Sequence, residues 1–200
     1  MSFIFYNMKK GLLLFWCALV LVAGCQSKQT EADTTTIQKT AAAPDSKSII
    51  ALYKEVDSLT RVGSMDRKKM QQFVDEAVEY ANKNTQDTIS PHFLLYAGVM
   101  QMQVAFSNAN EQQRTQQAEE AINILEKLRQ NHPDYQNLIY AYYYKAQIYE
   151  NLGKREEAAK TYRNLVERFP DTELAKNIAA YLQAGGYEKS AEEIMQGFQK

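Results

Sequence analysis

The chain has 200 residues, of which 45% are hydrophobic and 24% charged, a composition typical of a globular protein with one ordinary domain or two very small ones. Its formal net charge is −1, from 23 basic and 24 acidic residues, which argues against a dedicated nucleic-acid-binding protein, because phosphate contacts need a net basic face. The length excludes a (β/α)8 barrel, which takes about 250 residues, and eight Gly and four Pro are too few for an all-β architecture with many tight turns.

Residues 1–24 have the pattern of a secretory signal. Met8-Lys9-Lys10 is a short basic start, and an almost unbroken apolar run follows from Gly11 to Gly24 and ends in small residues. This run is too short to cross a bilayer core, which takes about 20 residues in a helix. Because the residues before Met8 are not basic, the sequence leaves open whether Met1 or Met8 is the true start.

The segment Leu21-Val22-Ala23-Gly24-Cys25 resembles the lipobox of bacterial lipoproteins. The resemblance implies cleavage before Cys25 and lipidation of Cys25, with acyl chains such as palmitate. Several acyl chains would anchor the protein stably, because two lipid signals suffice where one is marginal. The alternative is an ordinary signal peptide that happens to contain Cys25. After cleavage Cys25 is the sole cysteine, so we expect neither a disulfide nor a cysteine nucleophile.

Residues 25–47 are predicted to be a lipidated cysteine followed by a flexible tether. The composition shifts to Thr, Ser, Gln, Ala and Lys, as in Thr34-Thr35-Thr36 and Ala41-Ala42-Ala43-Pro44, and there is almost nothing to bury. A flexible segment of this length reaches roughly 25 Å. We therefore expect it to hold a soluble helical domain, residues 48–200, off a membrane.

Residues 48–200 are expected to be helical throughout, because apolar residues recur at helical spacing and no stretch alternates convincingly with period two. Ser90-Pro91 predicts a helix start with Ser90 as N-cap. Ser190 and Glu193 have the spacing of a capping box. The eight predicted helices cover about 48–61, 66–83, 91–107, 115–131, 136–152, 154–168, 171–184 and 188–198.

The chain resembles itself at an offset of 37 residues. Glu119-Glu120-Ala121 then falls on Glu156-Glu157-Ala158, and His132-Pro133-Asp134 falls on Phe169-Pro170-Asp171. Each Pro would stop a helix, and each Asp can cap the next one.

Two features of this repeat have local explanations. The glutamate pairs, with Glu192-Glu193 as a third, are best explained by a position early in a helix, where acidic residues complement the helix dipole. The Asn- and Gln-rich segment from Ser107 to Gln117 is predicted to be a solvated loop that lengthens the first copy of the repeat.

Residues 139–172 resemble a tetratricopeptide repeat (TPR). Lys145 and Arg155 depart from its pattern, because the repeat usually has an apolar residue at the first position and an aromatic residue at the second. The stretch from Thr88 to the C-terminus is also similar to TPR lipoproteins of Gram-negative cell envelopes. The positions that match the repeat are Tyr142, Ala146 and Tyr149 on its first helix and Ala158, Tyr162, Leu165 and Pro170 on its second.

The resemblance implies an all-α, TPR-like α-solenoid of about four antiparallel helix pairs. The first helices of such a stack together line a groove that binds an extended peptide or a partner helix. An alternative for Tyr140 and Tyr143 is packing against the adjacent pair. The residues that the resemblance places in this groove are Tyr140, Tyr143, Gln147, Glu150 and Asn151.

The sequence contains no catalytic or metal-binding motif, so we predict a protein that is not an enzyme and has no cofactor or metal. His92 and His132 are the only histidines, which leaves little material for zinc sites or histidine-based triads. His132 takes the place of Phe169 in the next repeat, so we expect it to pack in a turn, and we expect His92 to lie on the surface.

These observations together predict a lipid-anchored scaffold of the bacterial envelope that docks an envelope protein or peptide, touches the membrane only through its lipid, and binds no nucleic acid. Gln26 follows Cys25, where inner-membrane lipoproteins commonly carry Asp, so we expect the outer membrane and a periplasm-facing domain. One alternative is a small helical enzyme or a binder of glycan or lipid in the hollow of the solenoid. Another is a homodimer formed through the tyrosine face.

Overall fold

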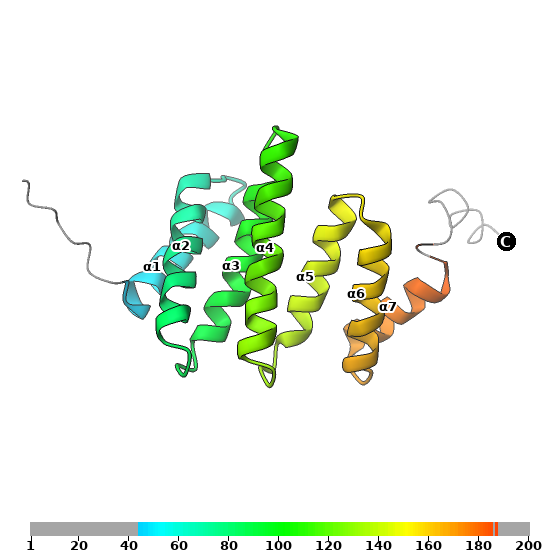
Figure 1. The fold of residues 1–200 in the computed structure, drawn as a ribbon. Helices are drawn as coiled ribbons and strands as arrows, with labels where there is room; N and C mark the ends of the chain where they lie inside the picture. The colour runs from blue at the N-terminus through cyan, green and yellow to red at the C-terminus, as the bar shows by residue number, and fades with distance from the viewer. Residues whose placement is uncertain (1–43, 186, 188–200) are drawn as a thin grey trace, which may run out of the picture. The chain divides into compact units, whose positions relative to one another are not determined.

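The computed structural model describes residues 44–185 and 187, and within them the chain forms seven α-helices and no strand (Figure 1). The predicted signal sequence, Cys25, nearly all of the tether and the predicted helix 188–198 lie outside the described residues. None of the described helices is both long and apolar enough to span a membrane. The helices are α1 (Ser46–Arg61), α2 (Arg67–Lys83), α3 (Ser90–Phe106), α4 (Glu111–Asn131), α5 (Leu138–Asn151), α6 (Arg155–Arg168) and α7 (Glu173–Gln183).

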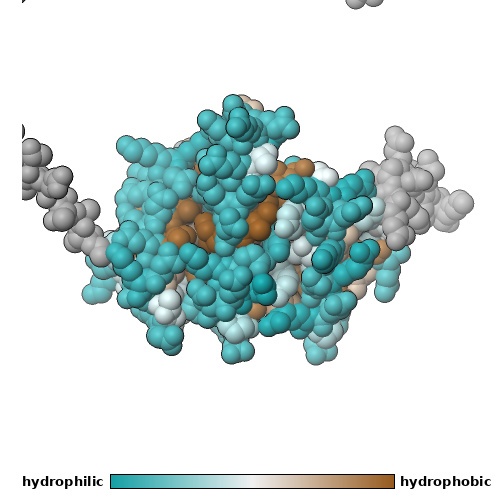
Figure 2. Space-filling view, viewed as in Figure 1, coloured by the Kyte–Doolittle hydropathy of each residue, from teal (hydrophilic) through white to brown (hydrophobic). Residues whose placement is uncertain are grey.

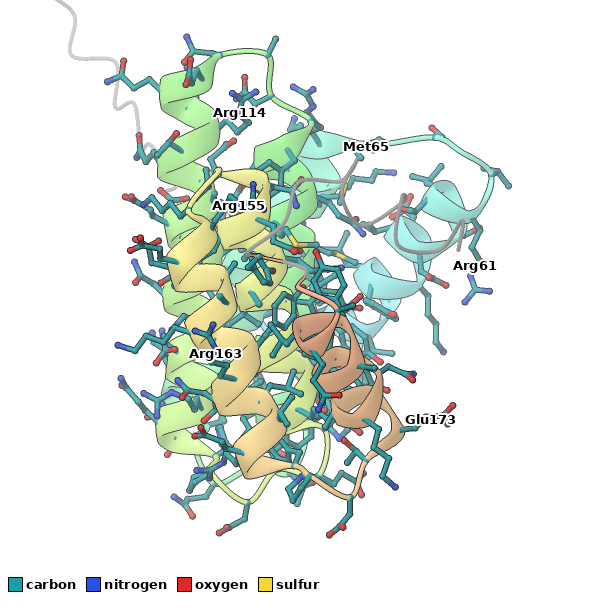
Figure 3. All side chains as sticks on the ribbon, turned by 90° about the vertical axis from the view of Figure 1, so that its right-hand side faces the viewer. Arg61, Met65, Arg114, Arg155, Arg163 and Glu173 are labelled. Carbon is teal, nitrogen blue, oxygen red and sulfur yellow. The ribbon has the colours of Figure 1, made fainter. Side chains whose placement is uncertain are left out.

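The helices stack in chain order, as expected for a solenoid of helix pairs. Each helix packs against the next one along the chain, and α3 also contacts α5. In Figure 1 the second helices of the pairs, α2, α4 and α6, lie toward the viewer. Figure 3, turned by 90°, shows α4 and α6 on one side and α1 and α7 on the other. The all-α class is therefore confirmed for the described part of the chain, and its arrangement is that of a TPR-like stack.

Helix starts are set by short polar side chains that accept hydrogen bonds from backbone amides. Asp45 accepts from the amides of Lys47 and Ser48 at the start of α1, and Thr172 accepts from the amide of Ala175 at the start of α7. The prediction that Asp171 caps this helix is therefore wrong by one residue. Gly153, with φ of +71°, makes the turn between α5 and α6, a conformation that glycine adopts without steric cost.

The prediction that Ser90 is an N-cap is also wrong. Ser90 is the first helical residue of α3, and its hydroxyl donates to the carbonyl of Asn84 at 2.6 Å. The N-cap position belongs to Ile89, whose amide donates to the carboxylate of Asp87 at 3.2 Å. Pro91 still occupies the first turn, where its missing N–H costs nothing.

The insertion in the first repeat is helical, and the predicted loop of residues 107–117 is much shorter. Only residues 107–110 connect the helices, because Asn110 accepts from the amide of Gln113 and starts α4 there. As a result α3 and α4 are 17 and 21 residues long, whereas α5 and α6 have 14 each. Glu119 and Glu120 consequently lie in the middle of α4, so the helix-dipole explanation fails for them.

Within each of the two repeats, small residues lie where the first helix crosses the second. Gly98 of α3 faces Leu125 of α4 so closely that an added Cβ would lie 2.5 Å from the leucine Cδ2. In the next pair Ala146 and Ala158 are fully buried. Leu128 and Leu165, which are equivalent in the two repeats, are also fully buried, and burial of a leucine stabilises a fold by roughly 1.5–3 kcal/mol.

Candidate interaction surface

Eight tyrosines lie near one another along the stack, and six of them belong to the first helices of the pairs. Successive ring centroids lie 4.7 Å apart for Tyr53 and Tyr96, 5.5 Å for Tyr143 and Tyr144, and 6.0 Å for Tyr162 and Tyr187. Tilted and edge-to-face arrangements at such distances are favourable for aromatic pairs. The row, called the tyrosine row below, consists of Tyr53 of α1, Tyr96 of α3, Tyr140, Tyr143 and Tyr144 of α5, Tyr162 of α6, Tyr181 of α7, and Tyr187.

The two tyrosines predicted to face a partner differ in exposure. Tyr140 is 43% exposed, and so is available to a partner. Tyr143 is half-buried, because its ring packs against Tyr144 and lies 6.3 Å from the ring of Tyr162 in α6. Its hydroxyl also accepts a hydrogen bond from the side-chain amide of Gln147 at 2.9 Å. Tyr143 therefore supports the surface as well as contributing to it.

The other three predicted groove residues are engaged within the chain. Gln147 is half-buried and donates to Tyr143, and the side-chain amide of Asn151 donates to the backbone carbonyl of Gln147 at 2.8 Å. Glu150 accepts from the hydroxyl of Tyr162 at 3.0 Å through one carboxylate oxygen and from the hydroxyl of Tyr187 at 2.5 Å through the other. Glu150 thus joins α5 to α6 and to the chain beyond α7.

The pKa values of Tyr144 and Tyr162 are raised, so their hydroxyls stay protonated at neutral pH. Burial, followed by the nearby carboxylate of Glu150, raises the pKa of Tyr162 far above its usual range. Burial raises the pKa of Tyr144 as well, and the neighbouring hydroxyls of Tyr143, Tyr140 and Tyr96 raise it further. Tyr143, Tyr140 and Tyr96 therefore each lie within electrostatic reach of Tyr144. A partner would meet hydrogen-bonding hydroxyls rather than phenolate charges.

The central part of this surface carries almost no charge. Helix α3 has no Asp, Glu, Lys or Arg, and α5 has only Lys145 and Glu150. The carboxylate of Glu150 is taken by two tyrosine hydroxyls. A surface of aromatic rings and uncharged hydrogen-bonding groups is typical of protein interfaces, where tyrosine is enriched.

Lys145, one of the two departures from the repeat pattern, connects the two repeats by an ion pair. Its ammonium binds Glu126 of α4 at 2.7 Å, and Arg129 binds the other oxygen of the same carboxylate at 2.7 Å. Burial alone would raise the pKa of Glu126, but the hydrogen bonds from Lys145 and Arg129 outweigh it and hold the pKa below its usual range. Lys145 is therefore directed away from the tyrosine row, toward α4.

An apolar hollow of about 430 Å³ adjoins the row at its N-terminal end. It lies between α1, α2, α3 and the loop before α3, and Tyr53 and Tyr96 form part of its wall. Its other lining residues are mainly apolar, namely Ile50, Phe73, Ile89 and Phe93. A hollow of this size accommodates one or two side chains of a partner or a small apolar ligand.

Both histidines are half-buried in the fold. His92 is half-buried rather than on the surface as predicted, and its Nδ1 lies 3.0 Å from the hydroxyl of Tyr135. His132 packs at the turn after α4, where burial lowers its pKa, and its Nε2 is buried without a hydrogen-bond partner within the described residues. No group of three or more metal-ligating side chains occurs in the part of the chain that the structure describes.

Sequence reasoning missed Tyr53, Tyr96, Tyr181 and Tyr187. Tyr96 could have been found, because α3 and α5 begin at the same point of the repeat and Tyr96 is then equivalent to Tyr144. The insertion between α3 and α4 shifted the first helix out of register with the second and concealed this equivalence.

Comparison with known proteins supports the repeat assignment. The family model of the tetratricopeptide repeat matches residues 94–135 and 140–172, which correspond to the pairs α3–α4 and α5–α6. Repeats of this type are protein-interaction modules and are typically not enzymes. No curated protein and no solved structure gives a significant match to the chain.

Proposed function

We propose that this protein is a lipid-anchored docking module of a bacterial envelope, in which Cys25 carries the lipid, residues 26–44 form the tether, and the tyrosine row captures a partner protein. The tether ends earlier than the sequence predicts, because α1 begins at Ser46. The observation that carries the proposal is the row itself. It includes the exposed Tyr96 and Tyr140, and the helices that carry them, α3 and α5, have almost no charged residues.

The partner is expected to be an envelope protein or peptide with an uncharged, partly apolar segment. Carboxylate-bearing peptide ends require clusters of Lys or Arg, and α3 and α5 together contribute only Lys145, which is paired with Glu126. Tyrosine rings and hydroxyls instead favour apolar side chains together with backbone carbonyls. The outer membrane and a periplasm-facing orientation are part of the proposal, on the basis of Gln26 after Cys25.

Site-specific photocrosslinking in the bacterium that makes the protein tests the docking surface. A photoreactive phenylalanine analogue placed at Tyr140 or Tyr96 should capture the same envelope protein. The matched control position is Arg163, an exposed residue of α6 (Figure 3). Capture of one partner from positions 140 and 96 but not from 163 is expected. Equal capture from all three positions, or none from a folded protein, would contradict the proposed surface.

Substitution of the tyrosines sharpens the same test. Tyr140→Ala should leave the helical content unchanged and weaken partner capture about tenfold or more, because exposed tyrosines are frequent hot spots at interfaces. Tyr143→Ala should weaken capture but also lower the melting temperature, since Tyr143 is half-buried. If Tyr140→Ala melts at a lower temperature and captures normally, the residue is structural and the docking surface lies elsewhere.

The lipid anchor is tested separately. Full-length protein with Cys25→Ala should partition into the soluble fraction, and mass spectrometry of the unchanged protein should detect a diacyl or triacyl modification at Cys25. An unmodified Cys25 on an internal peptide would contradict the anchor and leave the docking surface unaffected.

The apolar hollow favours a second candidate function, the binding of a small apolar ligand such as a lipid chain. Its walls are mainly aromatic and aliphatic, as in small-molecule sites. Native mass spectrometry of protein purified from the envelope would detect such a ligand. Widening the hollow by Ile89→Ala should then alter which chain lengths co-purify.

A further inference from the structure

The loop between α1 and α2, residues 62–66 and called the α1–α2 tip below, exposes two apolar side chains. Val62 is 78% exposed and Met65 is 47% exposed, and the other exposed large hydrophobic side chains of the described residues are tyrosines of the tyrosine row. Between them Gly63, with φ of +75°, has no atom within 4 Å of the place that a Cβ would take, so the tip is open. Figure 3 shows Met65 on the loop beyond the end of α1 that carries Arg61. On the face of α2 and α4, by contrast, apolar side chains are recessed between hydrophilic ones (Figure 2).

Basic residues flank the tip. The segment 61–69 has one acidic residue, Asp66, although acidic residues slightly outnumber basic ones in the whole chain. Two of its cations form ion pairs with carboxylates of α1, whereas Arg67 and Lys68 form none within the described residues. The basic residues of the segment are Arg61, Arg67, Lys68 and Lys69.

The position of these cations is unusual for a helix. Arg67, Lys68 and Lys69 occupy the first turn of α2, which contains no acidic residue. The N-terminus of a helix already carries a partial positive charge, so cations there are unfavourable. The carboxylate of Asp66 caps the helix by accepting from the amide of Lys69 and is the only acidic group of the segment. Helix stability therefore does not explain the three cations, whereas an anionic surface in front of this helix end would offset their repulsion.

We infer that the α1–α2 tip inserts into the surface of an anionic lipid bilayer, with Val62 and Met65 at the boundary of the acyl chains and Arg67 and Lys68 at the headgroup phosphates. Attachment of a protein to a bilayer surface strengthens with the apolar area that it buries and with its attraction to anionic lipids. The tip offers both within a few residues. It protrudes, so a deformable lipid surface can accommodate it without a preformed pocket.

This inference rests on the lipid anchor of the proposed function, because two side chains by themselves bind a bilayer only weakly. The tether joins the start of α1, at the opposite end of that helix from the tip, and the 16 residues of α1 span about 24 Å. A tether of this length reaches roughly 25 Å. The anchor therefore allows the tip to meet the bilayer. The contact would add to the lipid, which the sequence analysis expects to be the only membrane contact, and would orient the domain on the membrane.

The experiment attaches the full chain to vesicles and follows the tip with a fluorescent indole. Met65→Trp places the indole at an exposed position, and Trp16→Phe removes the other tryptophan of the chain. The vesicles contain phosphatidylglycerol and phosphatidylcholine in equal parts with brominated acyl chains, which quench an indole on contact. We expect quenching in these vesicles and much weaker quenching in vesicles of phosphatidylcholine alone.

The matched control is Arg163→Trp, at an exposed position of α6, where we expect no quenching (Figure 3). Equal quenching at both positions, or none from Met65→Trp in a folded and attached chain, would overturn the inference.

The attachment is made independent of the proposed lipidation. Chains are attached by their own lipid where mass spectrometry detects one at Cys25, and otherwise by coupling the Cys25 thiol to a maleimide headgroup in a Cys17→Ser chain. Absence of the natural lipid would then contradict the anchor, whereas absence of quenching in an attached chain would contradict the tip contact. The two failures are therefore distinguishable.

Variants of the tip locate the contact. In the Met65→Trp chain, Lys68→Gln should shift the equilibrium about fivefold toward the unbound tip, the effect of one cation near an anionic surface, and Arg67→Gln should act in the same direction. Val62→Ser should also reduce quenching, because apolar area is lost. The control is Lys176→Gln, the same change on an exposed lysine of α7, which should leave quenching unchanged. If Lys176→Gln reduces quenching as much as Lys68→Gln, the membrane attracts the overall charge of the protein and the inference fails.

Discussion

The pairs α3–α4 and α5–α6 are two copies of one structural unit, and they differ in ways that follow from their lengths and neighbours. The helices α3 and α5 begin at equivalent positions, and α4 and α6 end at equivalent positions, so the additional residues of the first pair lie at its turn. The copies also differ at two packing positions. The equivalent residues are Gly98 and Ala146 at the helix crossing, Leu128 and Leu165 in the core, and His132 and Phe169 after the second helix.

This comparison teaches that the repeat constrains its packing positions and tolerates additions at its turn. Extra residues at the turn project along the helix axis, where they meet solvent and carry caps such as Asn110. At the helix crossing, by contrast, the equivalent residues Gly98 and Ala146 differ in size by one methyl group. Interiors are close-packed, so such a change has to be matched by the facing residue. Three pairs of substitutions test whether the equivalent positions are energetically equivalent.

Truncation of the core leucines should have the largest effect. Leu128→Ala should lower the free energy of unfolding by about 3–4 kcal/mol, because it leaves a cavity among many buried neighbours. Leu165→Ala should cost less, about 2–3 kcal/mol, since its buried cluster has only two other members, Ile139 and Ala175, and can collapse more easily. Urea unfolding followed by circular dichroism measures both. A larger loss at Leu165 would show that the second pair, not the first, is the core of the fold.

Exchange of the small residues should give the next largest effect. Gly98→Ala should destabilise by about 1–2 kcal/mol, because crowding against Leu125 outweighs the better helix propensity of alanine. Ala146→Gly should also destabilise, by about 1–2 kcal/mol, because buried contact is lost and glycine weakens the helix. A more stable Gly98→Ala protein would mean that Leu125 can move and that the close approach is incidental.

Exchange of the residues after the second helices should have the smallest effect, and a pH dependence. Burial lowers the pKa of His132 below its ordinary value of 6.5, so the unfolded chain takes up a proton first as the pH falls. Stability from this residue is therefore present above pH 6.5 and is lost as the pH falls from 6.5 toward the lowered pKa.

His132→Phe, which introduces the residue of the second repeat, should remove this pH dependence and the unpaired Nε2. It should stabilise the protein by about 1 kcal/mol at pH 7 and by more at pH 5.5. The reverse change, Phe169→His, is the matched control and should introduce a loss of stability at low pH. Unfolding curves at pH 5.5, 6.5 and 7.5 measure both. If the stability of His132→Phe depends on pH as that of the unchanged protein does, His132 is not the source of the pH dependence.

Several elements were predictable because their causes are local. Helical spacing of apolar residues located all seven described helices, and the recurrence of Pro133 and Pro170 marked where α4 and α6 end. The caps were less predictable, since Thr172 and Asp171 are both good capping residues and only the path of the chain selects one. Of the candidate surface, Tyr140 is exposed, as its predicted groove position requires. Tyr53 and Tyr181 belong to other helices and had no signal in the sequence, and Tyr96 had only its equivalence with Tyr144 in the repeat.

The sequence by itself determined the helices, their pairing order and the register of the second helices, because helix periodicity depends on residues within a few positions of one another. Only the tertiary structure decided which exposed residues meet across helices. The tyrosine row and the pairing of Lys145 with Glu126 each draw residues from at least two helices. Their assembly depends on helix lengths and on how closely the helices cross, and these are set by long-range packing, for which one chain's periodicity carries no signal.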